Sequence, residues 1–133
     1  MKEYSKARIG KKGERIAARF LRRVGYRIVA KNVHCGRNEL DLIVKDKDFI
    51  IFVEVKTRTF AGTLPTARPA EAVDLDKRLR TAEAARAYLY RNYTALSPRF
   101  DVIEIYLDRE NHLRVARINH IEDAFSASGK IRR

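Results

Sequence analysis

The apolar run Phe49-Ile50-Ile51-Phe52-Val53, which leads directly into Glu54-Val55-Lys56, constrains the fold more than any other segment. A run of aromatic and β-branched residues predicts a strand buried on both faces, such as a central strand of a sheet. Side chains alternate along a strand, so Glu54 and Lys56 project to one face. Alone, this pair also fits an exposed ion pair, which contributes about 0–1 kcal/mol. Its position after a buried strand favours a functional site instead.

A second carboxylate, Asp41, lies on the preceding predicted strand. If Val44 pairs with Phe49 across the intervening turn, Asp41 faces Phe52 and becomes a diagonal neighbour of Glu54 on the same face. A slip of one residue would send Asp41 to the opposite face. The sequence therefore predicts an acidic pair, provided that the register is this one or differs from it by an even number.

Glu14 offers a third carboxylate, at the margin of the apolar arc of a predicted amphipathic helix. Two like charges about 4 Å apart repel by roughly 4 kcal/mol at an effective dielectric of 20, so Glu14, Asp41 and Glu54 would need a counter-cation. A divalent ion held by these carboxylates, Mg²⁺ with Mn²⁺ as a substitute, would meet that need and suits phosphodiester hydrolysis. Lys56 would orient or help deprotonate the attacking water, and it would neutralise charge developing on the phosphate.

The composition indicates a polyanionic partner. Lysine and arginine number 29 against 17 aspartates and glutamates, which gives a net charge of +12, while 45% apolar residues argue for a folded chain. Nucleic acid is the simplest partner for such a domain, although charge alone also fits an anionic membrane or a ribosome. We expect a cytoplasmic location and no membrane association, because neither a signal peptide nor an apolar span is recognisable.

Basic side chains near the predicted site are candidates for contacts with phosphate groups, which supply most sequence-independent affinity for nucleic acid. Taken singly, each also fits an ordinary solvated surface charge. The predicted nucleic-acid-binding residues are Lys11, Lys12, Arg15, Arg58, Lys77 and Arg80.

Periodicity and turn residues predict a single α/β domain over residues 1–125 and a basic, flexible tail over 126–133. Asp74 is a candidate N-cap for the second helix. The expected elements are a helix over 5–24, strands over 26–30, 40–44, 49–57 and 100–107, polar loops over 32–38 and 59–73, a second helix after Asp74, an edge strand over 112–118 and a short helical turn over 121–125.

Several short motifs together resemble the YraN family of small bacterial proteins. The motifs are Gly13-Glu14 on a basic first helix, Asn32, Glu39-Leu40-Asp41-Leu42-Ile43, Val53-Glu54-Val55-Lys56-Thr57-Arg58, Lys77 and Arg99-Phe100-Asp101. The resemblance runs from about Ala7 to Phe125. One departure is Asn38, where family members usually carry glycine; asparagine tolerates positive φ better than most residues, so the turn can survive.

That family belongs to the PD-(D/E)XK, or restriction-endonuclease-like, superfamily and is similar to archaeal Holliday junction resolvases. The resemblance implies a mixed central sheet of about five strands flanked by helices, with Asp41, Glu54 and Lys56 in the active site and Glu14 as the helix glutamate. Together with the residues, it supports the hypothesis of a magnesium-dependent endonuclease, with DNA favoured over RNA and branched DNA as a candidate substrate. The likeness to resolvases adds a homodimer as a further hypothesis. The alternative is a non-catalytic nucleic-acid-binding module that keeps the fold.

Overall fold

The computed structural model describes residues 3–66 and 73–132 and has the predicted α/β architecture. The elements are α1 (Lys6–Arg23), β1 (Arg27–Cys35), β2 (Asn38–Lys45), β3 (Phe49–Phe60), α2 (Leu75–Arg91), β4 (Ser97–Asp108), the short 3₁₀ helix η2 (Arg109–Asn111) and β5 (Arg114–Phe125). Among the described residues, no helix combines the length and the apolar content needed to cross a bilayer.

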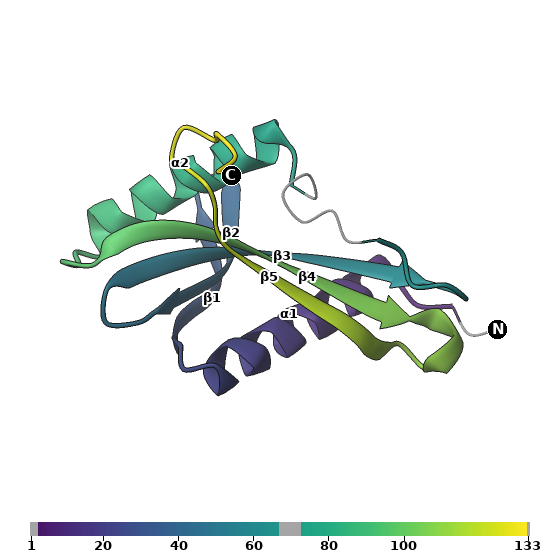
Figure 1. The fold of residues 1–133 in the computed structure, drawn as a ribbon. Coiled ribbons are helices and arrows are strands. Elements are labelled where there is room, and N and C mark those ends of the chain that lie inside the picture. The colour runs from purple at the N-terminus through teal and green to yellow at the C-terminus, as the bar shows by residue number, and fades with distance from the viewer. Residues whose placement is uncertain (1–2, 67–72, 133) are drawn as a thin grey trace.

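The strands form one mixed sheet in the order β1-β2-β3-β4-β5. Neighbouring strands are antiparallel except for β3 and β4, which are parallel. A parallel pair needs a crossover connection, and α2 supplies it. The two helices lie on opposite sides of the sheet (Figure 1). A mixed sheet with a helix on each face is the architecture expected for a restriction-endonuclease-like fold.

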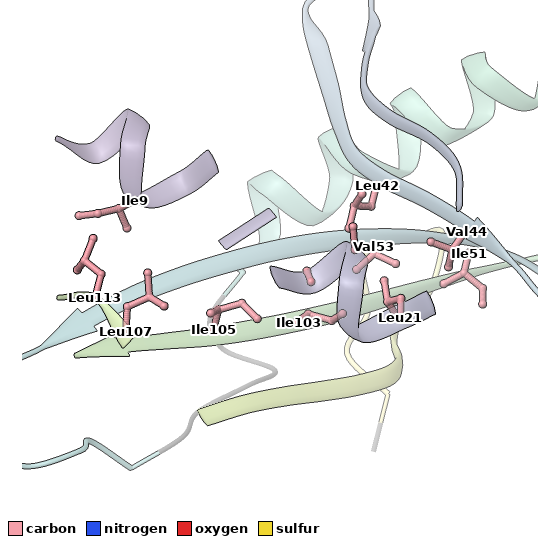
Figure 2. Packing of buried hydrophobic residues seen from close by; sticks show 12 residues of the cluster. Ile9, Leu21, Leu42, Val44, Ile51, Val53, Ile103, Ile105, Leu107 and Leu113 are labelled. Atoms are coloured by element: carbon pink, nitrogen blue, oxygen red, sulfur yellow. The ribbon is translucent and has the colours of Figure 1, made fainter. Parts of the chain in front are cut away.

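Each face of the central strands has its own apolar core, as predicted for a strand buried on both sides. On the α1 side, Ile9 and Leu21 point toward the aliphatic side chains of β3 and β4 (Figure 2). On the α2 side, Phe52 and Phe100 pack together, with ring centroids 5.7 Å apart. The apolar run of β3 therefore serves both cores.

Both helices begin at capping residues. The Ser5 side chain accepts a hydrogen bond from the Arg8 amide at α1, and Asp74 accepts from the Lys77 amide at 2.9 Å at α2. Such a cap satisfies an amide that the helix itself leaves unpaired, and it stabilises the helix by about 1 kcal/mol. The prediction that Asp74 caps the second helix is confirmed.

The predicted strand over 26–30 is too short, and the predicted helical turn over 121–125 is of the wrong type. Strand β1 continues to Cys35, through much of the predicted polar loop, and the positive φ of the β1–β2 turn lies at Gly36 rather than at Asn38. Residues Ile121–Phe125 form the end of β5 rather than a helical turn, because Phe125 pairs with Phe100 of β4. Of the predicted loop 59–73, residues 67–72 lie outside the described residues.

The segment after β5 packs more than the sequence indicates. The Gly129 carbonyl accepts a hydrogen bond from Arg78 Nε of α2 at 2.7 Å, and the Arg132 amide donates to the Ala124 carbonyl. The segment predicted as a flexible tail therefore makes hydrogen bonds to α2 and to β5. Its flexibility stays a prediction.

A buried polar cluster fixes the start of β4 to β5. Asp101, which is fully buried, accepts both hydrogen bonds of a bidentate pair with Arg99, at 2.8 and 2.9 Å. The same carboxylate contacts His120 Nε2 at 2.7 Å and accepts from the Asp123 amide. Hydrogen bonds to these groups lower the pKa of Asp101 against the opposing effect of burial. Arg99, Asp101 and His120 thus join the start of β4 to β5 through side chains that are largely withdrawn from solvent.

Helix α1 lies very close to β3 at Gly13. A Cβ atom built there would lie 1.8 Å from Thr57 Oγ1 and 2.8 Å from Thr57 Cβ, which is too close for either residue to stay in place. At Gly10, one turn earlier, an added Cβ would meet nothing within 4 Å. The glycine at position 13 therefore sets the spacing between helix and sheet.

We expect Gly13→Ala to lower the free energy of unfolding by about 1–3 kcal/mol, the usual cost of overpacking, despite the better helix propensity of alanine. Gly10→Ala is the matched control and should raise it by up to about 1 kcal/mol. Urea denaturation of both variants measures the difference. Equal stability of the two variants would show that the close approach at Gly13 does not constrain the fold.

Candidate active site

The candidate active site forms where β2 leaves β3. The pairs between these strands run from Lys45–Ile50 to Leu42–Val53. Farther along, β2 turns away from the direction of β3 (Figure 1), while β3 stays paired with β4 as far as Phe60. One edge of β3 is therefore open to the space between α1 and α2.

Asp41 takes over the hydrogen bond that the ladder loses at this point. The Asp46 amide donates to the Phe49 carbonyl, so by the alternation of antiparallel pairing the odd-numbered residues of β3 turn their amides toward β2. Val55 is the next such residue after the last pair, and its amide donates to Asp41 Oδ2 at 3.0 Å. This bond fixes the carboxylate against the β3 backbone.

The observed register brings Asp41 and Glu54 together. Val44 pairs with Ile51 rather than with Phe49, so the predicted register is wrong by two residues. An even shift leaves every side chain on its predicted face, and one further step of the observed register sets Asp41 opposite Glu54. The two carboxyl groups lie close enough that each shifts the pKa of the other. We refer to Asp41 and Glu54 as the carboxyl pair.

Burial makes the carboxyl pair costly to ionise. Glu54 is only 8% exposed, and burial, together with the nearby charge of Asp41, raises its pKa to about 8. Lys77 Nζ lies 3.7 Å from Glu54 Oε1 and opposes that rise. Burial also raises the pKa of Asp41, against the hydrogen bond from the Val55 amide. Near neutral pH the pair therefore retains a proton that a cation could replace.

Glu14 reaches the same region from α1. Burial and the charges of Asp41 and Glu39 raise its pKa. With the Asn32 amide oriented so that its nitrogen faces the carboxylates, Asn32 donates to Glu14 Oε1 and Glu39 Oε1, both at 3.2 Å. Asn32 has a φ of 49°, in the left-handed region that asparagine tolerates better than most residues. This backbone conformation of β1 allows Asn32 to bridge the two glutamates.

The site opens into two clefts. The large cleft has a volume of about 670 Å³, and α1, β3 and the first turns of α2 form its walls. The small cleft, of about 190 Å³, lies between α1, β1 and β2 and contains Asp41 in its lining. Glu14 lines both, and therefore marks where they meet. The titratable residues of the large cleft are Lys6, Glu14, Glu54, Lys56, Asp74, Lys77, Arg80 and Arg109.

Three predicted residues lie in the large cleft beside Glu54. Lys56 is exposed and shares a face of β3 with Glu54. Lys77 and Arg80 line the cleft from α2, where Lys77 pairs with Glu54 and Arg80 with Asp76. Lys77 is predicted to contact phosphate, and in the structure it forms an ion pair with Glu54 of the carboxyl pair.

Only some of the other predicted basic residues line a cleft of the site. Lys11 and Arg15 line the small cleft, whereas Lys12 and Arg58 line neither of the two clefts. Arg58 Nε is bound to the fully buried Glu104 at 3.0 Å, which holds it on the sheet. The structure therefore brings Lys11, Arg15, Lys77 and Arg80 to the site, and not Lys12 or Arg58.

Sequence reasoning missed two residues of the site. Arg109 of η2 lines the large cleft, and its Nε donates to Thr59 Oγ1 at 2.8 Å. In the sequence, Asn32 stands out only as part of a motif, and its place between two glutamates depends on the tertiary fold. The position of Arg109 at the start of η2 gives no local signal of its place in the cleft.

The carboxyl pair fits a magnesium ion held by two carboxylates. Over residues 3–66 and 73–132, no group of three or more His, Cys, Asp and Glu side chains has an arrangement that could hold a metal ion. Magnesium, however, commonly uses one or two carboxylates and keeps several waters. Asp41 and Glu54 supply two hard oxygen donors whose mutual repulsion a cation would relieve. Participation of Glu14 as a metal ligand stays a prediction.

We expect stability to fall as the pH rises from about 4.5 to 8. The folded protein holds the Glu54 proton up to a pKa of about 8, whereas the unfolded chain releases it near the ordinary value of 4.5, so folding takes up a proton within this window. The free energy of unfolding of Glu54→Gln should depend less on pH in this range. Between pH 5 and pH 9, this free energy should rise by about 1 kcal/mol or more relative to that of the wild type, since one pKa unit corresponds to about 1.4 kcal/mol.

Glu83→Gln is the matched control for this measurement, because Glu83 is exposed on α2. Urea denaturation of the three proteins at pH 5 and pH 9 gives the comparison. If Glu54→Gln and Glu83→Gln follow the same pH profile, the raised pKa of Glu54 is contradicted.

Comparison with known proteins places this arrangement in a family. Residues 13–105 match the uncharacterised protein family UPF0102. A UPF0102 protein of Caldanaerobacter subterraneus is 43% identical over 126 residues, covering 94% of this chain and all of the relative. Those of Chloroherpeton thalassium and Chlorobaculum tepidum are each 41% identical, covering 87% and 92% of this chain and 92% and 95% of the relatives. The chain therefore belongs to UPF0102, the YraN family that its motifs resemble.

Proposed function

We propose that this protein is a magnesium-dependent nuclease that hydrolyses phosphodiester bonds in DNA. The observation that carries the proposal is the carboxyl pair, held together at an open strand edge beside Lys56 and Lys77. Buried acids that repel each other are costly, so a fold that keeps them in contact at the wall of a cleft favours a catalytic use. The family itself is uncharacterised, so the proposal rests on this geometry and on the superfamily resemblance.

In the proposed mechanism, Asp41 and Glu54 would hold the cation, with Glu14 beside them. A divalent ion bound there would act as a Lewis acid on the phosphate and would lower the pKa of bound water. The Val55 amide keeps Asp41 in position, since it donates to the carboxylate from the strand backbone. Lys56 donates hydrogen bonds to the attacking water and to the phosphate oxygens as charge develops on them.

The charge of the large cleft supports a nucleic-acid substrate. Lys6, Lys56, Lys77, Arg80 and Arg109 line it, against three carboxylates. The chain as a whole carries a net charge of +12. Phosphate groups of a backbone passing through the cleft would find donors on α1, β3, α2 and η2, while the carboxyl pair faces the scissile bond.

A non-catalytic nucleic-acid-binding module is the second candidate. One observation favours it: Lys77 already pairs with Glu54, and the carboxyl pair can keep a proton, so the site is partly neutralised without a cation. This candidate predicts salt-sensitive binding that neither magnesium nor removal of the carboxylates changes.

Cleavage of linear duplex, single-stranded and four-way-junction DNA with Mg²⁺ or Mn²⁺ tests the nuclease. We expect Asp41→Asn, Glu54→Gln and Lys56→Met each to reduce the rate by about 100-fold or more, the scale of losing one group that stabilises the transition state. Glu83→Gln, an exposed neutral substitution on α2, should keep wild-type activity. Absence of cleavage by the wild type across the panel, or full activity of Glu54→Gln, would refute the enzymatic proposal.

Thermal unfolding with and without magnesium tests the cation site directly. A ligand that binds only the folded state raises its stability, by about 1.4 kcal/mol at ten times its dissociation constant, so Tm should rise by a few degrees. The double variant Asp41→Asn/Glu54→Gln should show no shift. An equal shift in both proteins would place the cation elsewhere, and no shift in either would favour the non-catalytic module.

A further inference from the structure

A second basic surface lies outside the large cleft, on the outer side of α1. Arg15, Arg19, Arg22 and Arg23 of α1 and Lys31 of β1 line a groove of about 440 Å³. All five residues are exposed, and no acidic residue contributes to the lining. We refer to this feature as the arginine groove.

The arginine groove concentrates charge that the protein does not neutralise. Within residues 3–66 and 73–132, none of its five members takes part in an ion pair. Arg15 and Arg19, and likewise Arg19 and Arg23, stand four residues apart on the helix, where like charges destabilise it. The helix dipole accounts for Arg22 and Arg23 in the last turn of α1, but not for the others. Such an arrangement fits a site for an anionic ligand better than a surface selected for stability.

The arginine groove is continuous with the candidate active site. Arg15 and Lys31 also line the small cleft, in which Glu14 and Asp41 lie. Arg22 and Lys31 also border a further open groove with Arg27. A chain of negative groups could therefore run from the carboxyl pair along the outside of α1 without leaving basic side chains.

The dimensions suit a phosphate backbone. Eight residues separate Arg15 from Arg23, which corresponds to about 12 Å along the helix axis at 1.5 Å per residue. One strand of duplex DNA carries a phosphate about every 3.4 Å along its axis. The groove thus spans about three or four nucleotides of one strand.

An anionic membrane fits the arginine groove less well. Helices that bind bilayers insert an apolar face below a basic one. The apolar face of α1 is already used, because Ile9, Ala17 and Leu21 are buried against the sheet. The solvent-facing side of α1 is therefore basic and offers no apolar face for a bilayer, which suits the phosphate backbone of nucleic acid.

We propose that the arginine groove binds the phosphate backbone of the nucleic-acid substrate on one side of the cleavage site. This inference rests on the proposed function for its substrate class and adds about three or four nucleotides of contact beyond the large cleft. The groove positions the flank and does not touch the scissile phosphate. Substrates that extend over α1 then bind more tightly than substrates that end at the carboxyl pair.

The test uses the triple variant Arg19→Gln/Arg22→Gln/Arg23→Gln. Its control is Lys47→Gln/Arg86→Gln/Arg91→Gln, which removes the same charge from exposed positions on the β2–β3 turn and on α2. Binding to a fluorescent 30-base-pair duplex is measured in EDTA over a salt series, so that cleavage plays no part. The slope of log K against log salt is negative, and each lost phosphate contact reduces its magnitude by about 0.9. We expect a decrease of about 2–3 for the groove variant and of less than 1 for the control.

Equal slopes for the two variants would overturn the proposal that the arginine groove binds nucleic acid. A larger loss of binding by the groove variant to vesicles of 25% anionic lipid than to the duplex would overturn it as well. The single variant Arg19→Gln, with an expected decrease of about 1, replaces the triple variant if the latter does not fold. Failure of the nuclease is distinguishable, because the wild type would then bind the duplex with the same slope without cleaving it. With an active wild type, the groove variant should raise KM for long substrates and leave kcat unchanged.

Discussion

The hydrogen bond from the Val55 amide to Asp41 is the interaction on which the candidate site depends. It lies where β2 and β3 separate, and it replaces a ladder bond by a bond to a side chain. A backbone amide left unpaired at that point would be costly, so the separation of the strands and the position of the carboxylate stabilise each other. The strand register, continued by one residue, then places Glu54 opposite Asp41.

The two helices contribute to the site in different ways. Helix α1 lies directly on β3 at Gly13, and this close approach carries Glu14 to the junction of the two clefts. Helix α2 begins beside the carboxyl pair because Asp74 caps it there, which brings Lys77 to Glu54. The same layer packing that forms the two cores therefore delivers one acid and one base to the strand edge. Outside α1, the arginine groove extends the basic surface away from that edge.

Local patterns in the sequence predict the strands, the helices and the acidic pair, but not their partners. The face shared by Asp41 and Glu54 follows from alternation and survives the error in register, because the error is even. Pairing decides what local propensity cannot: Ile121–Phe125 form a strand because β4 lies beside them. The bridging position of Asn32 and the place of Arg109 in the cleft depend on segments that are distant in sequence.

The open edge of β3 has a consequence for the protein in solution. Beyond Val55, its backbone groups on the cleft side face no strand within residues 3–66 and 73–132. Such an edge is a template on which another chain can add a strand and aggregate. Lys56 and the walls formed by α1 and α2 keep an incoming strand from lying flat along it. The gap beside the carboxyl pair is thus also an unpaired stretch of strand edge inside the sheet, and the basic residues that line the large cleft surround it with positive charge.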